Sequence, residues 1–197
     1  MIKYILLLIS CSTIFGQQAF SIFDPAMQAE TVVSAATPKI WITNSTTGSL
    51  AIGRYATAVW VATRFTNTAG SFTTASATLR LSKSGSPTGL LSAHIYSNDI
   101  GTNAPSVEIG SGSLTVSESS LGSTEGDVEF AGMSVGLTNG IYWLVVKKSG
   151  DPNSSNYSVW HYQSATYFAS GLLYAWSGSA WSPLSYSTQG KFIISGQ

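Results

Sequence analysis

The chain has 197 residues, of which 44% are hydrophobic and only 9% are charged, and its Lys+Arg and Asp+Glu totals are both 9. Soluble globular domains usually carry about 25% charged residues, so this chain is strongly depleted in charge. A chain with no net positive charge lacks the basic surface that holds nucleic acid or acidic lipid. Its 12% aromatic content also excludes intrinsic disorder.

The N-terminus has the pattern of an export signal. Lys3 precedes an apolar run over residues 5–9, and small residues follow that run. This order is typical of a secretory signal peptide, here residues 1–19, with cleavage after Gly16 or Ala19. The run is far shorter than the ~20 residues that span a bilayer. We therefore expect a protein that is secreted or displayed at the cell surface, with no transmembrane segment in the mature chain.

The only cysteine, Cys11, lies inside this signal. Residues 8–11 resemble a bacterial lipobox, in which the cysteine is lipidated and becomes the first residue. The apolar run, however, resumes at Ile14 and Phe15, which favours ordinary cleavage and the loss of Cys11. The mature protein would then have no thiol nucleophile, no disulfide and no cysteine-bound metal.

The rest of the chain predicts one all-β domain. Residues 20–54 are expected to form a leader or an added edge strand, with pairing at residues 39–42, and residues 55–197 a β-sandwich. A loop is expected at residues 98–105. Short strands separated by Gly, Pro and Asn turns indicate an antiparallel sandwich of jelly-roll type. They are expected at residues 57–66, 75–83, 91–96, 113–117, 126–130, 133–137, 140–147, 157–162, 172–176 and 191–195.

Period-two alternation predicts which side chains face the core. Residues 140–147 form the most apolar segment, so we expect them to be the central strand. In the strand at residues 91–96, the apolar side chains alternate with Ser92, His94 and Tyr96, which are expected on the polar face. The side chains expected on the core face of the strand at residues 75–83 are Ala75, Ala77, Leu79 and Leu81.

The order of these features resembles the choice-of-anchor domain family, R type, a group of exported bacterial β-sandwich domains. The matching segments are residues 61–66, 77–81, 85–89, 93–98, 140–146 and 192–196, together with Pro105 and Trp181. The resemblance implies a surface or extracellular module with no established catalytic residues. Homologues often continue into a C-terminal sorting segment, whereas this sequence stops at Gln197. We therefore expect any anchor to lie at Cys11 or in a partner, or to be absent.

Catalytic patterns in the sequence are weak, and we expect no enzyme activity and no cofactor. Ser134 lies in a G-x-S-x-G match, but a strand pattern follows it instead of the helix that a nucleophile elbow needs. His94 and His161 are the only imidazoles, and their spacing fits no zinc motif. A serine, a histidine and an acid brought together from distant strands stays open, because geometry defines such a set.

Two loops carry oxygen ligands but are not expected to bind a metal. Each has a single carboxylate, whereas Ca²⁺ usually takes more than one among its six to eight oxygens. Asn and Asp side chains also serve turns by bonding their own backbone. The residues concerned are Asp151, Asn153 and Asn156 in one loop, and Asn98, Asp99 and Asn103 in the other.

The aromatic residues between positions 160 and 186 carry the functional prediction. They either fill the core or form an exposed row, and an exposed aromatic row is an interaction surface. We predict a non-catalytic module that binds a polysaccharide or a cell surface; the alternative is a self-associating subunit of an extracellular layer or fibre. The candidate ligand-binding residues are Trp160, Tyr162, Tyr174, Trp176 and Trp181.

Overall fold

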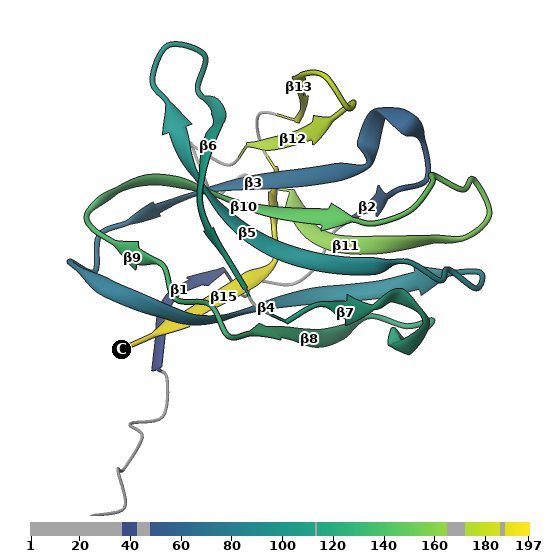
Figure 1. Cartoon of the computed structure of the whole chain (residues 1–197), viewed down its shortest axis with the longest axis horizontal. Helices are drawn as coiled ribbons and strands as arrows, with labels where there is room; N and C mark the ends of the chain where they lie inside the picture. Colours follow the sequence, from purple (N-terminus) through teal and green to yellow (C-terminus); the bar gives the residue numbers. More distant parts are fainter. Residues whose placement is uncertain (1–36, 43–47, 113, 165–171, 186–187) are drawn as a thin grey trace, which may run out of the picture. The chain divides into compact units, whose positions relative to one another are not determined.

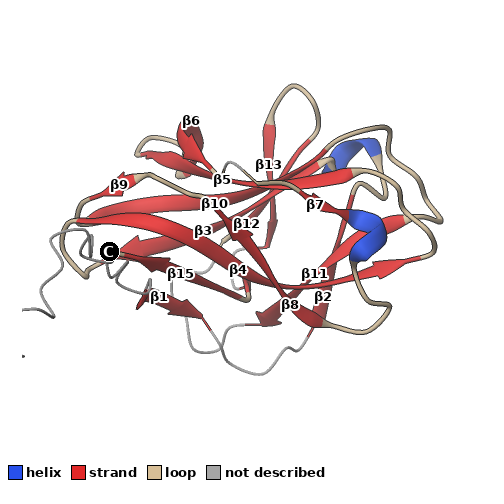
Figure 2. Ribbon diagram, turned by 60° about the horizontal axis from the view of Figure 1, so that its bottom comes forward, coloured by secondary structure: helices blue, strands red, loops and turns tan. Residues whose placement is uncertain are grey.

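A computed structural model describes residues 37–42, 48–112, 114–164, 172–185 and 188–197, and these residues form two stacked antiparallel sheets (Figures 1 and 2). The prediction of an all-β antiparallel sandwich is confirmed. Within the described ranges the only helical turns are two short 3-10 segments, η1 (Ala56–Ala58) and η2 (Glu118–Ser120). None of the helical segments in these ranges has the length and apolarity needed to cross a bilayer. The predicted signal and Cys11 lie outside the described residues.

The first sheet is organised around its longest strand, β4 (Phe72–Ser84). β8 and β9 pair along one edge of β4, and β15 and β11 follow each other along the opposite edge. Strands β1 and β2, from the segment predicted as a leader or added strand, pair with β15 and β11. The other strands are β1 (Thr37–Ile42), β2 (Gly48–Ile52), β8 (Gly126–Ala131), β9 (Gly136–Leu137), β11 (Tyr157–Ser164), β14 (Thr188–Gly190) and β15 (Phe192–Gly196).

Lys191, between β14 and β15, fills the fork at which β11 separates from β4. Its backbone N–H donates to the carbonyl oxygen of His161 at 3.0 Å, and its own carbonyl oxygen accepts from the backbone N–H of Arg80 at 3.3 Å. The same oxygen accepts from the indole Nε1–H of Trp160 at 3.0 Å. The C-terminal strands thus satisfy the backbone groups that the fork would leave unpaired.

The second sheet has the order β13-β12-β3-β10-β5-β6, with β7 beside β6 on the same edge of β5. As predicted, the segment at residues 140–147 is central, because β10 (Gly140–Lys148) lies between β3 and β5. The sequence did not predict β2, β6, β13 or β14, because these segments show little apolar alternation. The other strands are β3 (Trp60–Asn67), β5 (Leu90–Asp99), β6 (Ala104–Ser111), β7 (Val116–Ser117), β12 (Leu173–Trp176) and β13 (Trp181–Ser185).

The main core lies between the sheets and follows the predicted alternation, with one exception. Ala77, Leu79 and Leu81 are buried as expected, but Ala75 is not part of the core. A β-bulge causes the difference: β15 pairs with Thr74 and Ser76 across a register shift, so the inward face changes at this point. Its fully buried large side chains include Trp160, Phe130, Phe192, Leu79 and Ile194.

The predicted loop at residues 98–105 is in fact a tight hairpin. β5 continues to Asp99 and β6 starts at Ala104. The Asp99 carboxylate closes the turn by accepting the backbone N–H groups of Gly101 at 2.7 Å and Thr102 at 3.2 Å. Through this hairpin, β6 pairs with β5 and forms the edge of the second sheet.

Candidate functional site

The outer face of the second sheet is apolar, which is unusual for a sheet face that could meet water. On β10, Leu144 and Val146 point into the main core, while Trp143 and Val145 point to the opposite side and are still fully buried. A second hydrophobic cluster therefore forms outside the sandwich. Its buried members are Ala62, Tyr96, Ala104, Trp143, Val145, Leu172 and Tyr174, and Trp60 and Trp181 pack against them partly exposed.

This outer face is concave, because residues from distant strands touch across it. The rings of Tyr96 on β5 and Trp181 on β13 meet edge to face, with centroids 6.2 Å apart. Three strands lie between β5 and β13 in the sheet order, so in a flat sheet the two strands would be about 19 Å apart. The sheet must curl for the two side chains to meet.

Three tryptophans form a continuous row along one side of this face. Trp60 on β3 and Trp176 on β12 are register partners, and their rings stack with centroids 5.6 Å apart and planes 13° apart. Trp181 on β13 lies 5.3 Å from Trp176 at an angle of 55°. All three are partly exposed. We call Trp60, Tyr96, Trp176 and Trp181 the aromatic cluster.

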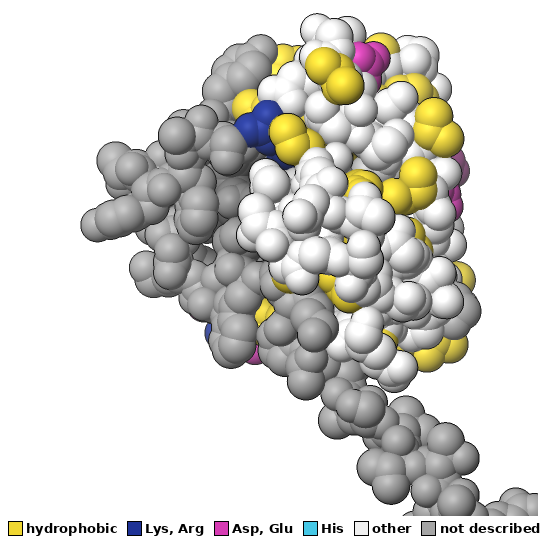
Figure 3. Space-filling model, turned by 90° about the vertical axis from the view of Figure 1, so that its left-hand side faces the viewer, with side chains coloured by type: hydrophobic (Ala, Val, Ile, Leu, Met, Phe, Trp, Pro, Cys, Tyr) yellow, Lys and Arg dark blue, Asp and Glu magenta, His cyan; other side chains and the backbone are white. Residues whose placement is uncertain are grey.

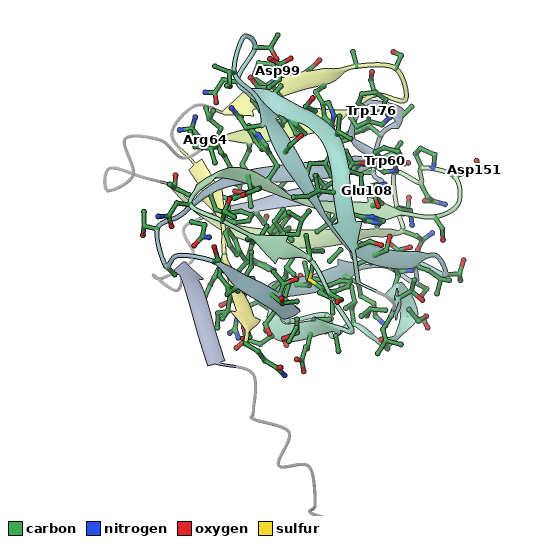
Figure 4. The ribbon with its side chains drawn as sticks, turned by 60° about the vertical axis from the view of Figure 1, so that its left-hand side comes forward. Trp60, Arg64, Asp99, Glu108, Asp151 and Trp176 are labelled. Atoms are coloured by element: carbon green, nitrogen blue, oxygen red, sulfur yellow. The ribbon has the colours of Figure 1, made fainter. Side chains whose placement is uncertain are left out.

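A polar network adjoins the aromatic cluster. The Lys147 ammonium lies 4.6 Å from the ring centroid of Trp60 and 5.2 Å from that of Tyr96, which are cation–π distances. It also donates to Glu108 Oε2 at 2.6 Å. The Tyr96 hydroxyl donates to the same oxygen at 3.2 Å. Figure 4 shows Trp60, Trp176 and Glu108 on this side of the molecule.

His94 and Ser92 complete the polar network. The Nδ1 atom of His94 lies 2.8 Å from Glu108 Oε1, and Nε2 lies 2.8 Å from the Ser92 hydroxyl oxygen. Both residues are on β5 at the spacing that places them on one face. We define the polar network as Ser92, His94, Glu108 and Lys147.

Burial and pairing set the charges of the polar network. Burial lowers the pKa of His94 and outweighs the opposing hydrogen bond to Glu108. Burial acts to raise the pKa of Glu108, but hydrogen bonds from Lys147 and His94 outweigh it, so the pKa is lowered. Burial acts to lower the pKa of Lys147, and its bonds to Glu108 and Tyr96 raise it instead. At neutral pH the network therefore holds a neutral imidazole beside one paired carboxylate and ammonium.

Next to the β5–β6 hairpin, hydrogen bonds fix side chains of the outer face. The Trp143 indole N–H donates to Asn98 Oδ1 at 2.8 Å, and its ring meets Tyr174 edge to face at 5.1 Å. Arg64 donates to Asn103 Oδ1 at 2.7 Å. Two of the amide oxygens considered as calcium ligands are thus committed to side chains of this face.

The five predicted ligand-binding residues do not share one surface. Trp160 is 1% exposed inside the main core, and Tyr162 lies on β11 in the first sheet against Gly48. Tyr174 is 6% exposed in the second hydrophobic cluster. Trp176 and Trp181 are partly exposed and adjacent. Tyr162 is partly exposed as well, but it lies on the first sheet, so only Trp176 and Trp181 share one accessible surface.

The sequence analysis missed Trp60, Lys147 and Glu108, and placed Tyr96 only on a polar face. Two signals were available. Tyr96 belongs to the polar face that carries Ser92 and His94, and Trp60 and Lys147 stand at the ends of the two most apolar strands. The sequence could not show which face Glu108 lies on, because its strand, β6, was not predicted.

The other sequence candidates are placed differently. Ser134 is exposed between β8 and β9, and a strand follows it. Neither histidine is paired with Ser134: His94 contacts Ser92 and His161 contacts Ser82. Asn153 Oδ1 accepts the backbone N–H groups of Ser155 and Asn156, as expected of a turn. In the part of the chain that the structure describes, no three His, Cys, Asp or Glu side chains gather closely enough to hold a metal.

A polar cavity of about 340 Å³ opens at one end of the sandwich, between the β4–β5 turn and the β10–β11 loop. Its lining includes Thr88, Gly89, Lys148, Asn153 and Asn156. The Lys148 ammonium is paired with the Glu118 carboxylate, which also accepts the Gly89 N–H at 2.9 Å. The Lys148 charge at this cavity is therefore used to hold the loops together, and the exposed Asp151 carboxylate is the other charged group of the lining.

No protein-family model matches the chain, and no curated protein matches its sequence. The resemblance to the choice-of-anchor family stays a prediction.

Proposed function

We propose that the chain is a secreted or surface-displayed module that binds a polysaccharide at the outer face of its second sheet. The observation that carries the proposal is the pair Trp176 and Trp181, partly exposed and 5.3 Å apart, beside a network of hydrogen-bonding groups. Partly exposed aromatic rings keep apolar area in contact with water, and burying that area against a ligand is favourable.

The chemistry of a sugar ring fits this surface. The face of an aromatic ring carries partial negative charge, which attracts the C–H bonds that a pyranose presents on its flat side. Trp60 lies between Trp176 and Lys147, so its faces are already covered. Trp181, at the outer end of the row, contacts Trp176 and the Tyr96 ring and is still partly exposed, so we expect the ligand to pack against it. Ser92, His94 and Glu108 offer partners for hydroxyl groups.

The charges of the site favour an uncharged ligand. Lys147 and Glu108 neutralise each other, and the lowered pKa of His94 keeps the imidazole neutral near pH 7. Charge is also sparse on the side of the molecule drawn in Figure 3, where uncharged polar side chains and backbone predominate among the described atoms. We therefore expect neutral glycans to bind more tightly than anionic ones.

A glycan array followed by calorimetry of the purified protein tests this proposal. We expect saturable binding of a neutral polysaccharide and a loss of about tenfold or more in affinity, equivalent to about 1.4 kcal/mol, in Trp181→Ala. Tyr55→Ala is the matched control, because Tyr55 is 53% exposed and contacts Arg54 instead of the aromatic cluster. Binding that survives Trp181→Ala unchanged would contradict the proposed site.

One observation favours the alternative of a self-associating subunit. β6 is an edge strand in the described part of the second sheet, and its side chains Val107 and Ile109 are 64% and 41% exposed. An exposed apolar edge is a template for pairing with another strand. Light scattering of the same sample separates the two functions: large assemblies that Val107→Lys disperses would favour the structural subunit over the monomeric binder.

A further inference from the structure

Both histidines of the chain lie between a serine hydroxyl and a carboxylate. His94 lies between Ser92 and Glu108, with 2.8 Å on each side. His161 lies between Ser82, at 2.9 Å from Nε2, and Glu125, at 3.4 Å from Nδ1. In each case Nε2 faces a serine hydroxyl and Nδ1 faces a carboxylate. A nucleophile, a base and a group that orients the base have this arrangement in serine hydrolases.

The partners of His94 determine where its proton lies. The lowered pKa of Glu108 keeps this carboxylate ionised, so it only accepts hydrogen bonds and Nδ1 of His94 carries the hydrogen. Burial keeps the imidazole neutral, so Nε2 has a free lone pair. The Ser92 hydroxyl must then donate to Nε2. This is the ground state that a general base needs before it takes a proton.

Lys147 supplies the positive charge of the polar network. It is the register partner of Ser92 on β10, and its ammonium reaches Glu108 on β6, on the far side of β5. The side chain therefore crosses β5, the strand that carries Ser92 and His94. A cation held there stabilises negative charge that develops on a substrate oxygen.

We propose that Ser92 is a nucleophile that hydrolyses carboxylic esters, with O-acyl groups on a bound glycan as the substrate class. Ser92 Oγ attacks the carbonyl carbon and His94 Nε2 takes the hydroxyl proton. The bond to the alcohol oxygen then breaks, and the leaving alcohol takes that proton. Water attacks the acyl-serine and passes a proton to His94. Collapse releases the carboxylic acid and returns the proton to Ser92.

The second set provides an internal control with the same three residue types. Ser82 is 5% exposed, so its hydroxyl is closed to a substrate, whereas Ser92 is partly exposed beside the aromatic cluster. The His161–Glu125 separation is also longer, at 3.4 Å. Only the Ser92 set therefore combines a tightly held base with an accessible hydroxyl.

The test uses the purified full chain, a fluorophosphonate probe and p-nitrophenyl acetate. We expect the probe to modify Ser92, as located by peptide mass spectrometry, and ester turnover to fall by about 10²–10⁴-fold in His94→Gln. Ser92→Ala should lose both signals, and Ser82→Ala should keep both. Wild-type turnover should also fall on acidification, because His94 then gains a proton and can no longer act as a base. A histidine with a purely structural role would not produce this loss of turnover.

Absence of labelling and turnover in the wild type, or labelling that persists in Ser92→Ala, would overturn the proposal. Circular dichroism of each variant shows whether it is folded. Because a small aryl ester needs no glycan to be recognised, this activity and polysaccharide binding can fail independently.

Discussion

The Lys148 ammonium on β10 is paired inside the protein with the Glu118 carboxylate of η2, and their side chains are 4% and 0% exposed. Ser158 donates to the other carboxylate oxygen at 2.6 Å, and the Gly89 N–H donates at 2.9 Å. One carboxylate therefore joins η2 to β10, β11 and the start of β5. The neighbouring Lys147 points to the opposite face of the sheet, so two adjacent lysines serve the two sides of one strand.

Glu118→Gln should strongly destabilise the fold. Removing one partner of a buried ion pair leaves the other charge uncompensated, which costs about 3–5 kcal/mol. Urea unfolding measures this difference. The control is Asp127→Asn, which breaks the surface pair with Arg80, where Asp127 is 60% exposed; we expect a cost of at most about 1 kcal/mol. Equal costs for the two variants would contradict the buried pairing.

Gly190→Ala should disturb the main core. A Cβ atom at position 190 would lie 2.6 Å from the ring of Trp160, which is fully buried and bonded to the Lys191 carbonyl and has no room to move. Overpacking of this kind costs about 1–3 kcal/mol. Gly136→Ala is the matched control, because nothing lies within 4 Å of its added Cβ. Thermal unfolding should separate the two alanine variants, and similar midpoints would refute the close approach.

Stability should fall as the pH drops below about 6.5. Burial lowers the pKa of both His94 and His161 from 6.5 in the folded state. Between the folded pKa and 6.5 the unfolded chain binds more protons, so acidification favours unfolding in that window; above it both states are neutral and the contribution vanishes.

The measurement is urea unfolding between pH 5 and pH 8, compared between the wild type and His94→Gln. The variant should lose part of the pH dependence. The proton NMR titration of the two imidazoles gives their pKa values directly, and a value above 6.5 for His94 would contradict the burial argument.

Trp60→Phe should remove an optical signature as well as some stability. Two indoles stacked at 5.6 Å and 13° couple their transitions, which gives a paired band in circular dichroism. Trp60→Phe should remove the part of the band that comes from the Trp60–Trp176 pair, whereas the tilted Trp176–Trp181 pair keeps its own coupling. Trp143→Phe should leave the band unchanged, because among the described residues the ring contact of Trp143 is with Tyr174. The smaller phenylalanine ring should stack less well on Trp176, which should cost at most about 0.5–1.5 kcal/mol in urea unfolding. A band unchanged by Trp60→Phe would show that the stack is not formed in solution.

The sequence predicted the fold where one strand has one polar and one apolar face. In β5, the alternation of Leu91, Ala93 and Ile95 with Ser92 and His94 was enough, because a period of two assigns each side chain to a face without knowledge of the partner strand. The sequence failed at β6, where Pro105 and Gly110 interrupt the alternation, and at Ala75, where a bulge changes the face.

The sequence by itself therefore determined the all-β class, the central apolar strand and the residues of most strand faces, since these depend on local spacing. The tertiary structure decided that Trp160 is core while Trp60 and Trp176 stack outside. It also decided that His94 meets Glu108 and that Tyr96 meets Trp181. These contacts depend on strand order, register and sheet curvature, which arise from pairing between distant segments and leave no periodic mark on either segment alone.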